Sequence, residues 1–303
     1  MSNEKPIKRF FLVSDMHYSV EAEDIAKISA MEGVYVSVAA GNAFGHTQRE
    51  KIDKISEAVL SEHKASPLDA VLVLGDLSID DFGFRNLPDN WCKKFKEECM
   101  DTLPCPAYAI AGNHDSHPND TWQRIFGYER EYALEFGDTV FLMLDNFASI
   151  PAKSASGAPF TPTNMTFLSE LLEKYRGRKI FLSAHHFDTE TDSEEFYRTV
   201  RENNDIVALF RGHKHIHKII TAACFGDKPL IDIGGYAYMG FCRDDGVWDF
   251  SHFDESIAWG YQILEIYEDR AVVYHVSADI DYKASNGNFS VKRSISDKLE
   301  LKL

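Results

Sequence analysis

The sequence predicts an α/β protein built as a layered sandwich of mixed β-sheets flanked by helices. Two observations lead to this fold class. Short apolar runs of strand length recur along the 303 residues, and amphipathic helical patterns lie between them. Unbroken apolar runs suit strands that are buried on both faces. An order of strand, helix and strand then places helices against the faces of the sheets.

Several segments are expected to be strands. The apolar runs are 9–15, 70–76, 107–113, 139–145, 179–185, 206–213 and 229–235. Two further segments are typical of hairpins, one around Gly137-Asp138 and one around Glu268-Asp269. Hairpins pair antiparallel strands, whereas helical crossovers join parallel ones, so the sheets should be mixed.

Two amphipathic helices are expected between the strands. Thr47 and Glu50 can form a capping box, and an apolar stripe at helical spacing follows them. A second stripe runs from Phe167 to Tyr175, with Gly177 as the expected C-cap. Stripes of this kind face a core, so we assign them no chemical role.

The sequence contains no repeat or low-complexity linker that would mark a domain boundary. We therefore expect a single catalytic domain, with a core of about residues 9–277 and a polar C-terminal extension, 278–303. The extension is either loosely attached or an edge strand. Residues 243–256 lack helical or strand periodicity and are expected to form a loop near the functional site, whose candidate residues are the polar strand ends described below.

Charge and cysteine content exclude several classes of protein. With 48 acidic and 32 basic residues, the formal charge of −16 repels polyanions, so nucleic acid is an unlikely partner and a small substrate is expected. No segment resembles a signal peptide or a membrane span, which predicts a cytoplasmic protein without a membrane partner. Five cysteines without a CxxC pair argue against a disulfide framework or a cysteine zinc site. The sequence does not indicate the oligomeric state.

Polar residues end most of the predicted strands. The polar segments are Asp15-Met16-His17, Gly75-Asp76, Gly112-Asn113-His114-Asp115, His185-His186 and Gly212-His213-Lys214-His215. In open α/β sheets, sites form at the carboxyl ends of the strands, so these residues can converge. In D-x-H and H-x-H, an extended backbone would send both side chains to the same face.

These segments supply a donor set that suits transition metals. The oxygen and imidazole donors are Asp15, His17, Asp76, Asn113, His185, His213 and His215. Without a thiolate, such a set favours divalent or trivalent Mn, Fe or Zn. Seven donors are too many for one ion but serve two ions if one carboxylate bridges, and Asp76 is the natural bridge. Two ions about 3.5–4 Å apart polarise phosphoryl oxygens and acidify a water for in-line attack. A single histidine at a strand end is more often a turn or core residue. The prediction of a two-metal site therefore depends on all of these segments occurring together in this order.

The ordered set closely resembles the calcineurin-like metallophosphoesterase family over about residues 9 to 217. Carried over residue by residue, the resemblance implies that Asp15, His17, Asp76 and His215 bind the first metal, and that Asp76, Asn113, His185 and His213 bind the second. His114 resembles the catalytic histidine that contacts the phosphate, and Asp115 resembles its orienting partner.

Two departures from the family pattern affect details of the site. Many members have a proline shortly after the fourth ligand, whereas this chain has His185-His186-Phe187. The resemblance assigns the ligand role to His185, and His186 becomes a candidate substrate contact. The stretch between Asp15 and Asp76 is also long, and its residues Asn42 and His46 are either substrate contacts or turn residues.

The resemblance implies hydrolysis of a phosphate ester, with phosphodiesters of the cyclic nucleotide or glycerophosphodiester type favoured. A phosphomonoesterase or a nucleotide pyrophosphatase would use the same ligands, because the pocket walls choose the substrate. The acidic charge disfavours a nuclease. A noncatalytic scaffold of the same fold, such as the family's retromer subunit, typically loses ligands, whereas all seven and His114 are present here.

Overall fold

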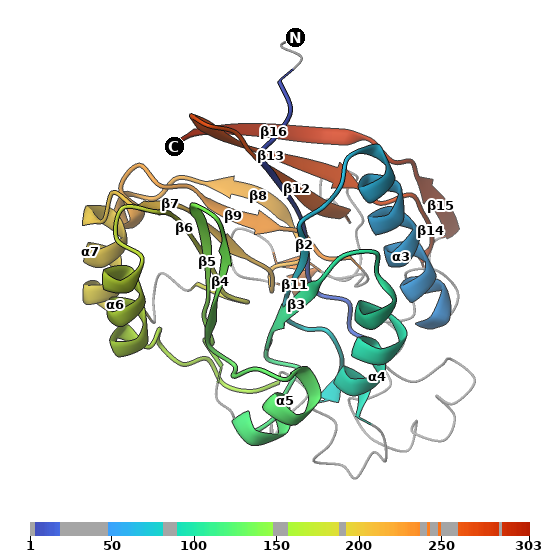
Figure 1. Cartoon of the computed structure of the whole chain (residues 1–303). Helices are drawn as coiled ribbons and strands as arrows, with labels where there is room; N and C mark the ends of the chain where they lie inside the picture. The colour runs from blue at the N-terminus through green and yellow to red at the C-terminus, as the bar shows by residue number, and fades with distance from the viewer. Residues whose placement is uncertain are drawn as a thin grey trace.

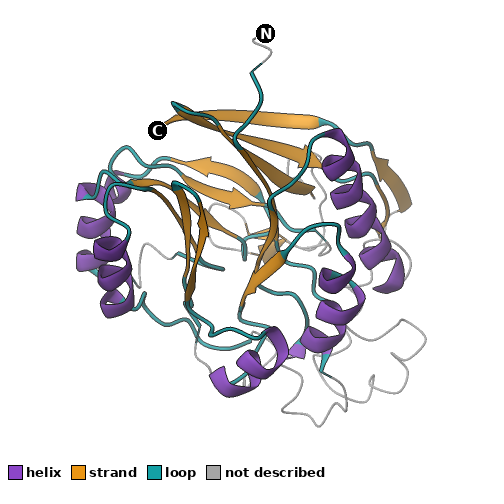
Figure 2. Ribbon diagram, viewed as in Figure 1, coloured by secondary structure: helices purple, strands orange, loops and turns teal. Residues whose placement is uncertain are grey.

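The computed structural model describes most of the chain: residues 4–18, 48–80, 90–147, 157–187, 192–236, 241–242, 248–249, 260–284 and 287–303. These residues form two six-stranded mixed sheets that pack face to face, with helices on the two outer faces (Figures 1 and 2). The expected layered α/β sandwich is confirmed. The loop predicted at 243–256 lies outside the described residues, apart from 248–249.

The first sheet has the strand order β16-β13-β12-β1-β2-β3. Its strands are β1 (Lys8–Val13), β2 (Ala70–Leu74), β3 (Ala107–Ile110), β12 (Gly260–Ile266), β13 (Arg270–Ser277) and β16 (Ile295–Lys302). Strands β1, β2 and β3 run parallel, and β1 pairs antiparallel with β12 on its other side. Strands β12 and β13 form the hairpin expected around Glu268-Asp269. Within the C-terminal extension, β16 is the edge strand of this sheet.

The second sheet has the strand order β4-β5-β6-β7-β9-β8. Its strands are β4 (Tyr132–Phe136), β5 (Thr139–Met143), β6 (Lys179–Ser183), β7 (Ile206–Arg211), β8 (His217–Ile220) and β9 (Leu230–Ile233). The four central strands are parallel, the β4–β5 hairpin turns at Gly137-Asp138, and β8 is antiparallel to β9. Two short antiparallel pairs stand apart: β10 (Phe241–Cys242) with β11 (Trp248–Asp249), and β14 (Ile280–Ala284) with β15 (Gly287–Val291).

Helices cover the outer face of each sheet (Figure 2). The first sheet is covered by α3 (Gln48–Ala65), α4 (Trp91–Glu98) and α5 (Asn119–Phe126), and the second by α6 (Met165–Lys174) and α7 (Glu194–Glu202). Short 3-10 turns are η3 (Met100–Thr102) and η4 (Ala223–Phe225). Among the helices described, none has the length and apolar character needed to cross a bilayer.

The two expected helices are present as α3 and α6. Thr47, the proposed cap of α3, lies outside the described residues. At the start of α6, the Asn164 side chain accepts a hydrogen bond from Phe167 N. The C-cap is Tyr175 rather than the expected Gly177, which follows two residues later in the left-handed region with φ 79°.

The strands are apolar throughout because both of their faces are buried. In β1, Phe10 packs between the sheets, where its ring lies 4.8 Å from that of Phe141. Phe11 points to the opposite face and packs in the layer under α3, α4 and α5. A third apolar layer fills the space between the second sheet and its helices. These layers fix the strand ends that carry the polar segments.

Candidate metal centre

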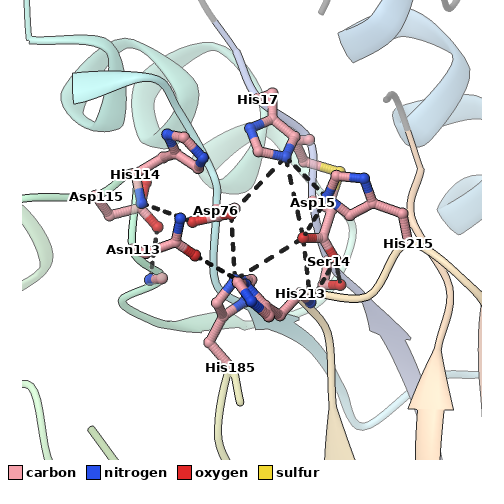
Figure 3. Close-up of polar contacts among 12 residues, drawn as sticks. Ser14, Asp15, His17, Asp76, Asn113, His114, Asp115, His185, His213 and His215 are labelled. Carbon is pink, nitrogen blue, oxygen red and sulfur yellow. Dashed lines mark hydrogen bonds and ion pairs between the residues drawn. The ribbon is translucent and has the colours of Figure 1, made fainter. Parts of the chain in front are cut away.

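The carboxyl ends of the parallel strands in both sheets meet at one edge of the sandwich. In the first sheet, β1 is followed by Asp15 and His17, β2 by Asp76, and β3 by Asn113. In the second sheet, β6 is followed by His185, and β7 by His213 and His215. Their side chains point toward one another (Figure 3). The structure thus brings together the seven donors expected from the sequence, drawn from segments far apart in the chain.

The donor atoms form two groups that share Asp76. One group is Asp15, His17, Asp76 and His215, and the other is Asp76, His185 and His213, with the atoms of each group within 4.8 Å of one another. The seventh donor, Asn113, lies beside the second group, where its Oδ1 is 3.0 Å from His213 Nδ1. The common carboxylate is the one expected to bridge two ions.

In the first group, the imidazole nitrogens face both a carboxylate and each other. His215 Nε2 lies 3.1 Å from Asp15 Oδ1 and 3.3 Å from His17 Nε2. Burial keeps the pKa of His17 well below its ordinary value, and the nearby His114 and His215 add to this lowering although Asp76 opposes it. His17 is therefore neutral near pH 7, which is the form that binds a metal.

In the second group, His185 directs its Nε2 toward Asp76. Its Nδ1 donates to Leu74 O at 2.7 Å, which leaves Nε2 facing Asp76 Oδ2 at 3.2 Å without a hydrogen bond. A backbone carbonyl behind a histidine is the arrangement that orients metal-binding imidazoles. Burial disfavours the charged ring, yet Asp76 and Asp15 together raise the pKa of His185 to about 9. The two carboxylates thus favour positive charge next to His185 Nε2.

The shared carboxylate is held by its surroundings. Asp76 Oδ1 accepts a hydrogen bond from the His114 backbone N–H at 2.8 Å. Burial alone would raise the pKa of Asp76, but His185, His114 and His17 lower it well below its ordinary value. Asp76 is therefore ionised, as a bridging ligand must be. Together with the buried imidazole nitrogens, this carboxylate fits two transition-metal ions.

The D-x-H pair (Asp15 and His17) and the H-x-H pair (His213 and His215) converge through left-handed turns. The expectation of an extended backbone at these pairs is therefore wrong. Asp15, His17, His213 and His215 have φ values of 58°, 45°, 69° and 54°, and Asp76 has φ 49°. Non-glycine residues are uncommon in this region, and such conformations cluster at functional sites. The turns reverse the chain beyond each strand end and direct both members of a pair into the centre.

Two glycines allow the strand ends to approach closely. Gly75 has φ 86°, and a Cβ there would collide with the ring of His185. A Cβ on Gly112 would collide with the carboxylate and backbone of Asp76. The glycines of the GD and GNHD segments are therefore required by packing against the donors themselves.

Asp115, expected to orient the His114 imidazole, uses both carboxylate oxygens to bind neighbouring segments of the chain. Its Oδ1 accepts from Ser78 N at 3.0 Å and from Ser78 Oγ at 3.1 Å, while Oδ2 accepts from Leu77 N at 3.1 Å and Gly112 N at 2.9 Å. Both oxygens thus join the segment after β2 to the GNHD segment. Asp115 thereby positions the turn that carries His114.

His114 lies at the side of the first donor group. Its ring centroid is 5.1 Å from that of His17, and the residue is partly exposed whereas His17 is buried. This combination of proximity and access suits a group that meets a substrate at the centre.

His186 lies beside the second donor group, next to the buried ligand candidate His185. Its ring centroid is 4.6 Å from that of His213 and 5.3 Å from that of Phe160. Phe147 packs against Phe160 at 5.8 Å on the same side. Sequence analysis did not single out these two phenylalanines, and nothing in the local pattern distinguishes them. The other substrate-contact candidates, Asn42 and His46, lie outside the described residues.

A third cluster of donor types lies next to α4. Asp80, Cys92 and His117 bring potential ligand atoms within 4.8 Å of one another. Asp80 already accepts from Trp91 N at 2.7 Å and Cys92 N at 3.0 Å, and its Oδ2 lies 2.6 Å from His117 Nε2. The carboxylate therefore caps the first turn of the helix, which gives this cluster a structural role.

Comparisons with known proteins agree with this geometry. Residues 8–217 match the calcineurin-like phosphoesterase family. A comparison with curated proteins found no match. Among solved structures, the fold is similar to a dimetal phosphatase from Danio rerio, with a TM-score of 0.61, 14% identity, and coverage of 98% of this chain and 99% of that one.

More distant similarity reaches two other proteins. A putative 5'-nucleotidase from Staphylococcus aureus has a TM-score of 0.47 and 12% identity, with 97% of this chain and 54% of that one covered. Vps29 from Chaetomium thermophilum has a TM-score of 0.42 and 11% identity, with 97% of each chain covered. The family match spans more than two thirds of the sequence and includes every strand end that carries a donor, so the chain belongs to the calcineurin-like phosphoesterase family.

Proposed function

We propose that this chain hydrolyses phosphate esters with two transition-metal ions, Mn, Fe or Zn, held by Asp15, His17, Asp76, Asn113, His185, His213 and His215. One observation carries the proposal: two buried donor groups meet at a single carboxylate, that of Asp76. When bound, two such ions would polarise the phosphoryl oxygens and would acidify a water molecule into a nucleophile at neutral pH.

The chain's own residues supply orientation and a proton. Asp76 fixes the two donor groups relative to each other and, through its Oδ1, holds the backbone of His114. We assign His114 to the ester itself, as the group that donates a proton or hydrogen bond to the leaving oxygen. Asp115 keeps the turn around His114 in place through Leu77, Ser78 and Gly112. A positioned acid of this kind contributes typically about 10²–10⁴-fold.

A small phosphodiester is the proposed substrate, of the cyclic nucleotide or glycerophosphodiester type. The net charge of −16 opposes binding of polyanions and favours a substrate with a single negative charge. His186 and Phe160 lie beside the second donor group and are proposed to line the substrate side of the pocket. A phosphomonoesterase or a nucleotide pyrophosphatase is the alternative, because the same centre would serve either reaction.

A panel of phosphomonoesters, linear diesters, cyclic nucleotides and pyrophosphates, tested with Mn, Fe and Zn, decides between these substrates. We expect the highest kcat/KM for a small diester. A preference for monoesters or pyrophosphates would replace the diester assignment and leave the hydrolase assignment intact. Absence of bound metal together with absence of turnover would instead identify a scaffold protein, and would overturn the proposed function.

A further inference from the structure

A buried lysine lies behind the first donor group. Lys51, in the first turn of α3, is only 1% exposed. Its Nζ donates to Met16 O at 3.0 Å and to His17 O at 3.2 Å. Lysine is almost never fully buried, because removing an ammonium from water is costly unless strong hydrogen bonds replace the water. The two carbonyls that compensate Lys51 belong to the segment that carries Asp15 and His17.

That segment adopts a conformation that needs support from outside. Asp15 and His17 both have positive φ, a region that residues other than glycine adopt uncommonly. The N–H groups of the segment are held by the segment after β2: Asp15 N donates to Gly75 O at 3.1 Å, and His17 N donates to Asp76 O at 3.0 Å. Lys51 holds the carbonyl groups of Met16 and His17 in the same turn.

We infer that Lys51 is a positioning residue for the first metal, the one assigned to Asp15, His17, Asp76 and His215. Lys51 fixes the carbonyls of the Asp-Met-His turn, and the segment after β2 fixes its N–H groups. The turn is thereby held in the shape that aims Asp15 and His17 at the centre. The inference rests on the proposed metal-dependent function. It concerns one ion, since His185, His213 and Asn113 of the second group follow other strands.

The test measures metal affinity separately at each donor group. In a His185→Ala background the first group remains intact, and in a His215→Ala background the second group remains intact. Lys51→Met, which keeps the apolar stem and removes the donor, is added to each background. Lys54→Met is the matched control, because Lys54 lies on the same helix and, among the residues that the structure describes, its Nζ contacts Asp279 O at 3.5 Å and not the Asp-Met-His turn. Metal-free full-length chains are titrated with Mn²⁺ by calorimetry, and their unfolding midpoints are recorded.

Lys51→Met should weaken Mn²⁺ binding about 10–100-fold in the His185→Ala background, the usual range for residues that support metal ligands. It should leave binding in the His215→Ala background unchanged, and Lys51→Arg, which keeps the charge and the donors, should retain most of the affinity. Equal losses in both backgrounds would show a general structural role, and no loss in either would show no role; either result overturns the inference. If Lys51→Met does not fold, Lys51→Gln is judged by the same criterion. A wild-type chain that binds no Mn²⁺, Fe²⁺ or Zn²⁺ would instead contradict the proposed function.

Discussion

Two clusters in this molecule contain similar residues but use their donor atoms differently. In the metal centre, His17 Nε2 faces His215 Nε2 at 3.3 Å, and the buried His185 Nε2 makes no hydrogen bond. In the cluster at α4, Asp80 accepts hydrogen bonds from two backbone N–H groups and lies 2.6 Å from His117 Nε2. The presence of ligand-type residues within reach of one another therefore does not define a metal site. The centre differs in its imidazole nitrogens, two of which face each other while a third makes no hydrogen bond, whereas both oxygens of Asp80 accept from protein donors.

The largest effect is expected from Asp76→Asn, because both donor groups depend on that carboxylate. Both ions should be lost or weakened, and turnover should fall by more than the roughly 10²–10⁴-fold typical of losing one acid–base group. Asn113→Ala, which removes a donor from one group only, is the control and should have a smaller effect. The metal content and kcat of Asp76→Asn and Asn113→Ala are measured and compared. Two metals per chain with near-normal turnover in Asp76→Asn would refute the bridge.

The adjacent histidines sharpen the comparison within the centre itself. His185→Ala should lose one metal, because its Nε2 faces Asp76 Oδ2 at 3.2 Å from a ring held by Leu74 O. His186→Ala should keep both metals and change mainly KM, because its ring packs against His213 and Phe160 at the side of the group. Metal content and substrate saturation curves distinguish the two. The opposite metal contents would transfer the ligand role to His186.

His114→Ala tests a residue that lies at the centre without being assigned to a metal. Both ions should remain, while turnover of alkyl esters should fall by about 10²–10⁴-fold through loss of the acid. An activated aryl ester, whose leaving group needs no proton, should be much less affected. Comparing kcat on the two esters, with metal content measured in parallel, is the decisive measurement. Equal losses on both would exclude leaving-group protonation and leave phosphate positioning as the role of His114.

The smallest effect on activity is expected at the α4 cluster. Asp80→Ala should retain two metals and near-normal turnover, but it removes the acceptor for the buried Trp91 N and Cys92 N. An unsatisfied buried donor costs about 1–3 kcal/mol, so the free energy of unfolding should fall by that order. Denaturant unfolding of the metal-free chain measures it. If Asp80→Ala lost a metal, the contrast between the two clusters would be wrong.

Much of the fold could be predicted because burial on both faces makes each strand a continuous apolar run. The polar residue that ends such a run marks the carboxyl end of a strand, and parallel strands bring these ends together. This reasoning assigned Asp76 and His185 to one site, and in the structure they follow strands of different sheets. The shape of the turns could not be predicted in the same way. Asp15 and His17 have positive φ values, and their N–H groups donate to Gly75 O and Asp76 O, contacts that form only in the tertiary structure.

The supporting residues were harder to predict than the donors. Asp115 was expected to orient His114, but the direction of its side chain depends on the turn geometry, which sends both oxygens to backbone N–H groups. For Lys51 a weak signal did exist: it lies four residues before Ile55, on the buried stripe of α3. A charged residue on an apolar stripe can signal a buried ionic contact, whereas the identity of its partners depends on tertiary structure.

The order of strands in the first sheet has a consequence for how this protein matures. Strand β1, which leads into Asp15, lies between β2 and β12, so its second neighbour is supplied by residues 260–266 near the end of the chain. His17 and His215 are themselves separated by 198 residues. Contacts of such long range form slowly, and only after most of the polypeptide has been made. A metal held by both His17 and His215 would therefore be bound only after the two sheets have docked, and would not guide the first steps of folding.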